Sequence, residues 1–259
     1  MDPHDFDRII ARAHDPRLIP GIYNYCDGRC PRCPFTERCL AFGENARDDE
    51  ADAVEASLER TIAMLTEIAR REGVDLSAIA DRQEAAAVVT LDHERDPLVA
   101  RARDYSTIAW RVSRAVTPGV AARGDPAAID AVETIEWFSS RIAAKVYRAV
   151  CGRADAAGAD GPGDHTEVQT DFDGSAKAAL LGMRESRLAW LTLMEAGKAS
   201  ADGVPALAVK VLDDLDAAVR ERFPHAEQFV RPGFDEPDVA AGAPATLPPW
   251  ARRPPRAGI

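Results

Sequence analysis

The dipeptide Asp-Pro precedes two long stretches of helical pattern and fixes where two helices of this chain begin. Asp96-Pro97 and Asp125-Pro126 each place a capping carboxylate before a proline, which at the first helical position needs no amide hydrogen bond. After Asp96-Pro97, apolar side chains recur with a period of about 3.6 residues. We expect this helix to end at Thr117-Pro118-Gly119 and the second to reach about Val150.

The rest of the chain has the same helical character. Apolar periodicity predicts further helices at residues 5–14, 48–72, 75–89, 175–196 and 205–223, and it places Leu58, Leu65 and Ile68 on one apolar stripe. Hydrophobic residues make up 46% of the chain but aromatic residues only 6%, so aliphatic side chains must fill the core. We therefore predict an all-α fold, a helical bundle of about five long helices with an N-terminal cysteine-rich metal-binding loop.

Composition divides the chain into three predicted regions. Residues 1–43 are expected to form an N-terminal helix and the cysteine-cluster loop, which is polar and rich in turn residues. Residues 44–235 are expected to form the helical bundle, which a mobile, acidic, Gly-rich loop at residues 152–172 interrupts. Residues 236–259 are Pro-rich and are expected to form a tail with too little apolar surface for a core.

The charge and the N-terminal residues disfavour several classes of protein. Lys and Arg number 32 and Asp and Glu 43, which gives a formal net charge of −11. An acidic surface repels phosphate backbones, so we do not expect a nucleic-acid partner. No apolar run reaches the roughly 18 residues that cross a bilayer, and the first residues lack the basic and apolar regions of a secretory signal. We expect a cytoplasmic protein with no membrane partner.

Four of the five cysteines lie close together in the sequence. Cys26, Cys30, Cys33 and Cys39 have the spacing Cys-x3-Cys-x2-Cys-x5-Cys, whereas Cys151, at the end of a predicted helix, is expected to be a buried thiol. A reducing cytosol disfavours disulfides, and a polar, turn-rich segment does not bury four thiols. The cluster therefore predicts a metal site.

Two kinds of metal centre suit four thiolates. Structural zinc sites usually take their ligands from two Cys-x2-Cys pairs a dozen or more residues apart, and this segment has only one such pair. An iron–sulfur cluster is larger and can be enclosed by one short loop. The spacing therefore favours a [4Fe-4S] cluster bound by Cys26, Cys30, Cys33 and Cys39, with zinc as the alternative.

Part of the cysteine segment resembles a known metal-binding loop. The stretch from Cys30 to Cys39, Cys-Pro-Arg-Cys-Pro-Phe-Thr-Glu-Arg-Cys, is similar to the iron–sulfur loop of helix-hairpin-helix DNA glycosylases, whose last three ligands have the same spacing. The gap before Cys30 is shorter here, and the chain has no Leu-Pro-Gly-Val-Gly hairpin followed by a catalytic Asp. The resemblance implies the cofactor and not the glycosylase activity. The first three cysteines also match the pattern of radical S-adenosylmethionine enzymes, but the strands of their barrel are missing from the sequence pattern.

The longer segment from Ile19 to Cys39 carries a second resemblance. Together with Glu136-Trp137 and the downstream stretch Asp173-Gly-Ser-Ala-Lys177, it resembles a family of helical bacterial proteins with the pattern Tyr-Cys-Asp-x2-Cys-x2-Cys-x-Phe-Thr-x-Arg-Cys. This resemblance implies one structural unit and no particular activity.

Positive charges on an apolar helix face predict a second site. Lys177 and Arg184 follow the apolar stripe of the helix at residues 175–196, and long cationic side chains on such a face either extend to solvent or need anions. The anions would come from Glu133, Glu136, Asp171, Asp173 or a ligand. We therefore predict a polar pocket for an anionic small molecule, lined by Tyr105, Glu136, Lys145, Asp173, Lys177 and Arg184.

These sequence patterns are compatible with three functions. The favoured one is a metal-cluster protein with a redox, sensing or structural role and a redox or protein partner. The alternatives are a zinc-stabilised scaffold or interaction protein, and an enzyme that works in the anion-binding pocket. A di-iron carboxylate site is disfavoured because no His has a Glu three residues before it.

Overall fold

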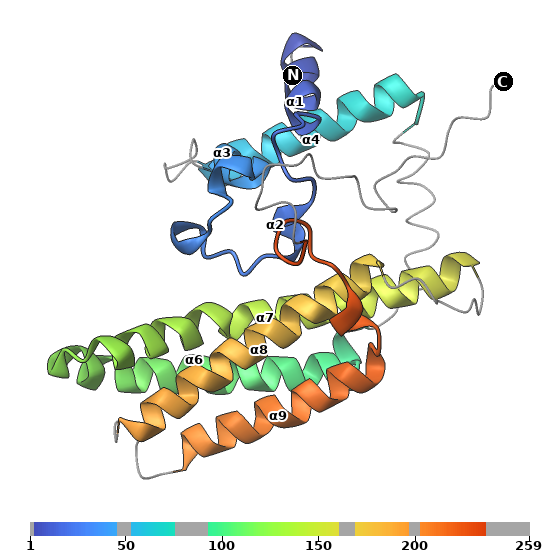
Figure 1. The fold of residues 1–259 in the computed structure, drawn as a ribbon. Coiled ribbons are helices and arrows are strands. Elements are labelled where there is room, and N and C mark those ends of the chain that lie inside the picture. Colours follow the sequence, from blue (N-terminus) through green and yellow to red (C-terminus); the bar gives the residue numbers. More distant parts are fainter. Residues whose placement is uncertain (1–2, 46–52, 76–92, 161–168, 197–202, 237–259) are drawn as a thin grey trace. The chain divides into compact units, whose positions relative to one another are not determined.

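The computed structural model describes residues 3–45, 53–75, 93–160, 169–196 and 203–236. All regular elements of these residues are helices, which confirms the all-α class (Figure 1). The α-helices are α1 (Pro3–Ala13), α2 (Ile22–Tyr25), α3 (Leu40–Asn45), α4 (Ala53–Glu72), α6 (Pro97–Arg123), α7 (Pro126–Asp160), α8 (Asp171–Glu195) and α9 (Val204–Arg222). The 3-10 helices are η1 (Cys30–Arg32), η2 (Thr36–Arg38), η4 (His93–Arg95) and η5 (Ala226–Gln228).

The chain divides into two compact units. Among the described residues, the bundle unit contains residues 24–27, 93–160, 169–196 and 203–231, and the N-terminal unit contains residues 3–23, 28–45, 53–75 and 232–236. These bounds differ from the predicted division at residues 43 and 44, because α4 belongs to the N-terminal unit and not to the bundle. Its partner there is α1, and the two helices are joined by an ion pair between Arg71 and Asp7.

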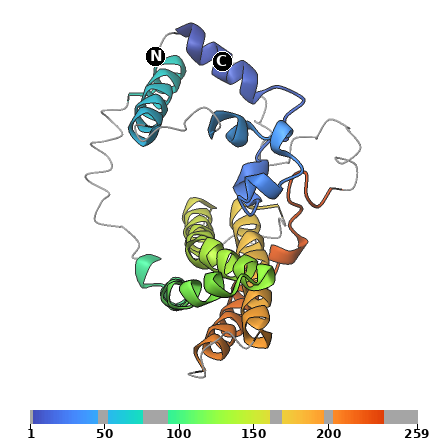
Figure 2. The same cartoon turned by 90° about the vertical axis from the view of Figure 1, so that its left-hand side faces the viewer.

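The bundle unit is built from α6, α7, α8 and α9, which lie side by side (Figures 1 and 2). The most extensive packing joins α7 to α8, and α6 and α9 complete the core. Mostly aliphatic side chains fill this core, together with five buried aromatic residues: Tyr105, Phe138, Phe172, Trp190 and Phe223. The expectation that helices of this composition pack through aliphatic side chains is confirmed.

Both Asp-Pro helix starts are confirmed, and both helices run further than predicted. The Asp96 carboxylate accepts from the Leu98 N–H at 2.8 Å, and the Asp125 carboxylate accepts from the Ala127 N–H at 3.0 Å. The predicted end of the first helix at residues 117–119 is wrong. The helix continues to Arg123 because Val120 is buried in the core, and Gly124, with a φ of +66°, ends it.

The predicted loop at residues 152–172 is helical over much of its length. The helix α7 continues to Asp160, because its last turns still pack: Gly152 lies against Phe172, and Ala156 contacts the core. Residues 161–168 of the predicted loop lie outside the described residues. Cys151 therefore lies inside a helix and is partly exposed, so the prediction of a buried thiol at its last turn is wrong.

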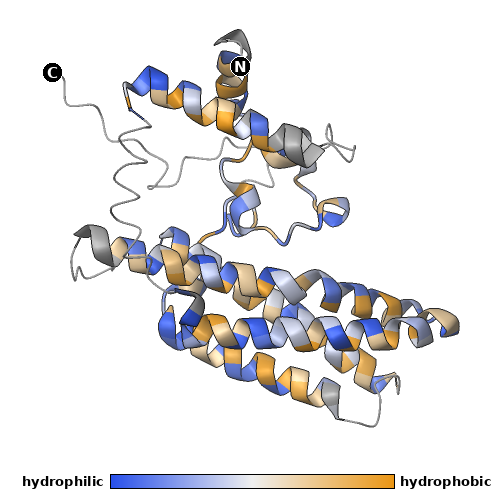
Figure 3. Cartoon of the chain, turned by 180° about the vertical axis from the view of Figure 1, so that it is seen from behind, coloured by the Kyte–Doolittle hydropathy of each residue, from blue (hydrophilic) through white to orange (hydrophobic). Residues whose placement is uncertain are grey.

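The N-terminal unit has a much smaller core. Ile19 and Ile22 are buried against Phe35, Cys39 and Phe234. The predicted apolar stripe of α4 is not buried: Leu58 is 60% and Leu65 56% exposed, and Figure 3 shows hydrophobic residues at intervals along this helix. The helix predicted at residues 75–89 lies outside the described residues after residue 75, and so do residues 237–259 of the predicted tail.

Candidate functional site

Tight turns shape the backbone of the cysteine segment. Gly28 has a φ of +70°, a conformation that favours glycine, and its carbonyl accepts from the Cys30 N–H at 2.9 Å. The helix η1 begins at Cys30, and η2 ends one residue before Cys39. The cysteine-cluster loop predicted within residues 1–43 therefore contains several short helical turns.

The thiols of this segment are accessible donors. All five cysteines are among the described residues, none forms a disulfide, and each is partly exposed. The Phe35 N–H donates to the Cys33 Sγ at 3.5 Å, the kind of contact that supports a thiolate ligand. Within the described residues, no three His, Cys, Asp or Glu side chains are arranged to hold a metal ion. The donor chemistry of four thiols thus fits a thiolate-bound metal, while their arrangement as ligands stays a prediction.

The first cysteine lies in a segment that two side chains of α7 hold. We call residues 24–27 the Cys26 segment; they belong to the bundle unit. The Lys145 ammonium donates to the carbonyl oxygen of Asn24, and the indole Nε1–H of Trp137 donates to the carbonyl oxygen of Asp27 at 2.8 Å. The carbonyls on both sides of Cys26 are therefore fixed to one helix.

A second set of contacts attaches the Cys26 segment to α8. Tyr25 is 1% exposed, and its hydroxyl donates to the Asp171 carboxylate at 2.8 Å. Arg148 donates to the same carboxylate through two nitrogens, at 2.6 and 3.0 Å. The Tyr25 ring packs on Phe229, with ring centroids 4.7 Å apart. Burial, and then the negative charge of Asp171, raise the pKa of Tyr25.

Gly174 provides the space that Tyr25 occupies. A Cβ atom at this position would lie 2.5 Å from Tyr25 Cε1 and 2.6 Å from Phe229 Cζ, closer than van der Waals contact allows. A side chain at position 174 would therefore displace one of the two rings. Because this glycine lies inside α8, the close approach of Tyr25 explains its presence better than any backbone requirement.

The electrostatic surroundings of Lys145 link it to the first cysteine. Burial and then the neighbouring Arg148 lower the pKa of Lys145, whereas negative charge on Cys26 and Asp171 raises it. The ammonium group of Lys145 is thus partly desolvated and lies within electrostatic range of the Cys26 thiol.

The six residues predicted to line one anion pocket do not converge. Tyr105 is buried in the core, where its hydroxyl contacts Ser186 and accepts from the Trp190 indole at 3.2 Å. Glu136 is exposed and lies 3.5 Å from the Thr117 hydroxyl. Lys145 holds the Cys26 segment, as described above.

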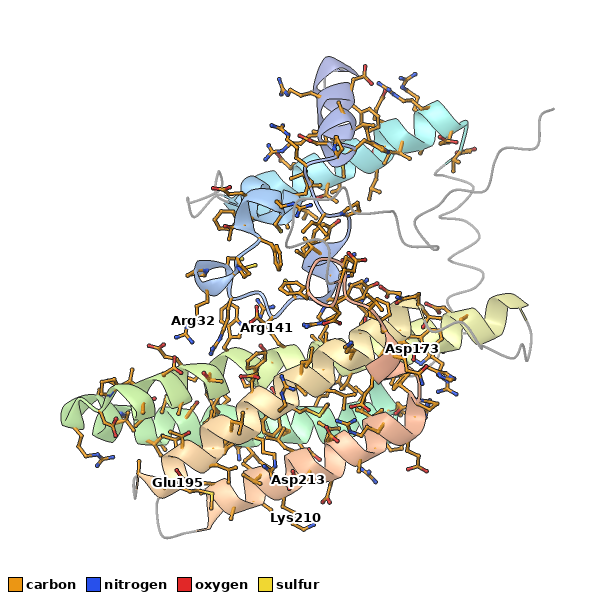
Figure 4. The ribbon with its side chains drawn as sticks, viewed as in Figure 1. Arg32, Arg141, Asp173, Glu195, Lys210 and Asp213 are labelled. Carbon is orange, nitrogen blue, oxygen red and sulfur yellow. The ribbon has the colours of Figure 1, made fainter. Side chains whose placement is uncertain are left out.

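Asp173 has a structural role at the start of α8 (Figure 4). Its N–H donates to the Thr170 hydroxyl oxygen at 3.1 Å, and the Thr170 hydroxyl donates to the Asp173 carboxylate at 2.6 Å. This pair caps the helix, with Thr170 as the N-cap residue.

Lys177 and Arg184 of the predicted set line one cavity, which has a volume of about 410 Å³ and is formed by residues of α8, α9 and η5. The Lys177 ammonium donates to the carbonyl oxygens of Phe229 at 2.5 Å and Glu227 at 3.3 Å. Arg184 is exposed and lies 3.6 Å from the neighbouring Glu185. Lys177 therefore holds the chain after α9, and Arg184 extends to solvent.

The acidic partners of this cavity come from α9 and not from the predicted residues on α7 and at the start of α8. Arg187 pairs with Asp213 at 2.7 Å (Asp213 is labelled in Figure 4), and Arg220 pairs with Asp216 at 2.5 Å and with Glu227. Hydrogen bonds to Asp216 and then to Glu227 raise the pKa of Arg220, and burial opposes this rise only in part. Arg187 joins α8 to α9, whereas Arg220 pairs within α9 and with η5, so both cations of the cavity have carboxylate partners.

No protein-family model, curated protein or solved structure matches this chain. None of the described helices has the length and apolar character needed to cross a membrane.

The sequence did not indicate which residues hold the Cys26 segment. Trp137, Arg148, Asp171 and Gly174 carry no metal-binding or catalytic signature, and the contacts of Trp137, Asp171 and Gly174 with the segment join residues more than a hundred positions apart. The sequence singled out the stretches Glu136-Trp137 and Asp173–Lys177 together with the cysteine pattern, but it did not indicate what they contact.

Proposed function

We propose that this chain is an iron–sulfur protein that binds one [4Fe-4S] cluster through Cys26, Cys30, Cys33 and Cys39. The observation that carries the proposal is four thiols within one short segment with a single Cys-x2-Cys pair. Thiolates from such a compact segment suit a cluster better than the two separated pairs that usually bind zinc.

The local structure supports the proposal at the level of donor chemistry. None of the four cysteines is in a disulfide, and each is partly exposed, as metal ligands near a surface need to be. The Phe35 N–H donates to Cys33, and backbone amides that donate to sulfur stabilise the negative charge of thiolate ligands. The turn at Gly28 separates the first ligand from the second.

A bound [4Fe-4S] cluster takes up and releases single electrons, so we propose a role in electron transfer or redox sensing in the cytoplasm, with a redox protein as partner. The acidic chain, with a formal net charge of −11, suits a protein partner better than a nucleic acid. A structural role, in which the cluster only stabilises the segment, uses the same ligands.

Metal analysis of the full-length chain after anaerobic purification tests this function. We expect about four iron and about four acid-labile sulfide per chain, with broad visible absorption that bleaches on reduction. The Cys33→Ser variant loses most of the iron, whereas the matched Cys151→Ser variant retains it, because Cys151 lies on α7 away from the cysteine pattern. One zinc per chain without sulfide would replace the proposal with a zinc-stabilised scaffold, and a chain without metal would refute both.

A further inference from the structure

The Cys26 segment is attached to the bundle through its backbone carbonyls. Lys145 donates to the carbonyl oxygen of Asn24, two residues before Cys26, and Trp137 donates to that of Asp27, one residue after it. Contacts to main-chain carbonyls do not depend on the identity of the residues at positions 24 and 27. They therefore fix the path of the backbone through Cys26 itself.

Both donors lie on the same face of a rigid helix. Residues 137 and 145 are eight positions apart in α7, which is two whole turns plus about 80°, so their side chains leave the helix less than a quarter turn apart. Between and beside them, Phe138, Ile142 and Val146 are buried in the core. The positions of the two donors are therefore set by the best-packed helix of the bundle.

Each donor has a second contact that restricts its side chain. The Arg141 guanidinium lies 4.2 Å from the centroid of the Trp137 ring, a cation–π distance. The Lys145 side chain is partly buried and lies in the electrostatic field of Cys26 and Asp171. A partly buried ammonium group depends on a hydrogen-bond partner, and the carbonyl oxygen of Asn24 provides one.

We propose that Lys145 and Trp137 are positioning residues for the first metal ligand: they hold the backbone on both sides of Cys26 on α7 before metal binds, and Lys145 offsets the charge of the bound centre. The inference rests on the proposed function for the identity of the centre. The attachment of residues 24–27 to α7 can be measured in the metal-free chain. Gly174, Asp171 and Arg148 complete the attachment through Tyr25.

Hydrogen–deuterium exchange of the metal-free, full-length chain tests the positioning. In Lys145→Met we expect residues 24–27 to exchange about tenfold faster than in the wild type, because a charge-assisted hydrogen bond is lost. In Trp137→Phe we expect these residues to exchange about threefold faster than in the wild type, because a neutral donor is lost while most of the ring remains. Lys145→Arg keeps a cationic donor and restores most of the protection.

Matched controls separate positioning from general destabilisation. Lys210→Met removes an exposed lysine that pairs with Asp214 on α9, and Trp110→Phe alters an exposed tryptophan on α6. Neither control should change exchange at residues 24–27. If Lys145→Met and Trp137→Phe match these controls there, or if all four variants lose the protection of the whole bundle equally, the positioning role is wrong.

The metal-loaded chain provides a second readout. In Lys145→Met we expect iron to be released to a chelator about threefold faster than in the wild type, and the reduction potential to become more negative, because a positive charge is removed. Lys210→Met should behave as the wild type. A wild-type chain without iron and sulfide would refute the proposed function, whereas unchanged exchange in the metal-free chain would refute the positioning, so the two failures are distinguishable.

Discussion

The two compact units of this protein are stabilised by different interactions. In the bundle unit, four long helices bury a continuous aliphatic core that includes Trp190 and Tyr105. In the N-terminal unit, the buried core is centred on Ile19 and Ile22, and several of the surrounding contacts are between charged side chains. The difference shows that helical periodicity predicts a helix in both units but predicts burial only where a partner helix covers the apolar face.

The helix α4 illustrates this point. Its apolar stripe is as regular as those of the bundle helices, yet Leu58 and Leu65 are exposed and the buried residue is Ala69. Its described partners are charged: Glu67 pairs with Arg70 at 2.6 Å and with Arg71 at 2.7 Å, and Arg71 reaches Asp7 of α1. Surface ion pairs of this kind contribute little free energy, so we expect this unit to be the less stable of the two.

Truncation of a core residue should have the largest effect. Trp190→Ala should lower the free energy of unfolding of the bundle by about 3–5 kcal/mol, because it leaves a cavity and removes the donor to Tyr105. Leu65→Ala, on the exposed stripe of α4, should change stability by less than about 0.5 kcal/mol. Urea denaturation followed by far-ultraviolet circular dichroism measures both. If Leu65→Ala lowered the free energy of unfolding nearly as much as Trp190→Ala, the apolar stripe of α4 would be buried in solution. That result would contradict the contrast between the two units.

A substitution that adds one methyl group should have an intermediate effect. Gly174→Ala would place a Cβ atom 2.5 Å from Tyr25 Cε1, so we expect a loss of about 1–3 kcal/mol and displacement of Tyr25. Gly119→Ala in α6 meets only the Arg123 side chain at 3.7 Å, and it should stabilise the helix by about 0.5–1 kcal/mol. Thermal unfolding of both variants gives the sign of each change. A stabilising Gly174→Ala would contradict the close packing on α8.

Acidification should have the smallest effect, which we expect to detect in α4 of the N-terminal unit. Hydrogen bonds from Arg70 and then Arg71 hold the pKa of Glu67 at about 2, below its ordinary value of 4.5. A carboxylate with a lowered pKa stabilises the fold above the ordinary value, and this contribution is lost as the pH falls from 4.5 towards 2. Hydrogen exchange of α4 should therefore accelerate over this range.

A matched pair of variants isolates the contribution of Glu67. Glu67→Gln should remove most of the pH dependence of exchange in α4, whereas Glu59→Gln, at an exposed position of the same helix, should leave it intact. High salt should weaken the effect in the wild type, because the ion pairs are at the surface. Equal pH dependence in both variants would show that another group controls the acid response.

Local signals in the sequence predicted most of the bundle. Asp96 and Asp125 act as helix caps as expected, because capping depends on neighbouring residues only. The end of α6 was mispredicted because burial of Val120 continues the helix past Pro118, and burial depends on tertiary packing. Tertiary packing also explains why α7 extends over residues 152–160 of the loop predicted at residues 152–172.

The candidate site was predictable only in part. The cysteine spacing identified the donors, but the residues that hold Cys26 come from α7 and α8, and no local pattern connects them. In the predicted anion pocket the sequence indicates the charges but not their partners. Lys177 donates to backbone carbonyls, and Arg187 pairs with Asp213 of the next helix. Helical periodicity specifies which face a residue occupies and not which element lies opposite that face.

The attachment of Tyr25 also sets an order of events during synthesis of the chain. Tyr25 and Asp171 are 146 residues apart, and Lys145 is 121 residues from Asn24. A ribosome makes the N-terminal segment first, so the hydrogen bond from Tyr25 to Asp171 cannot form until the start of α8 has been translated. The first cysteine therefore reaches its final position only after most of the bundle has been made. Until then its thiol must stay reduced and unbound.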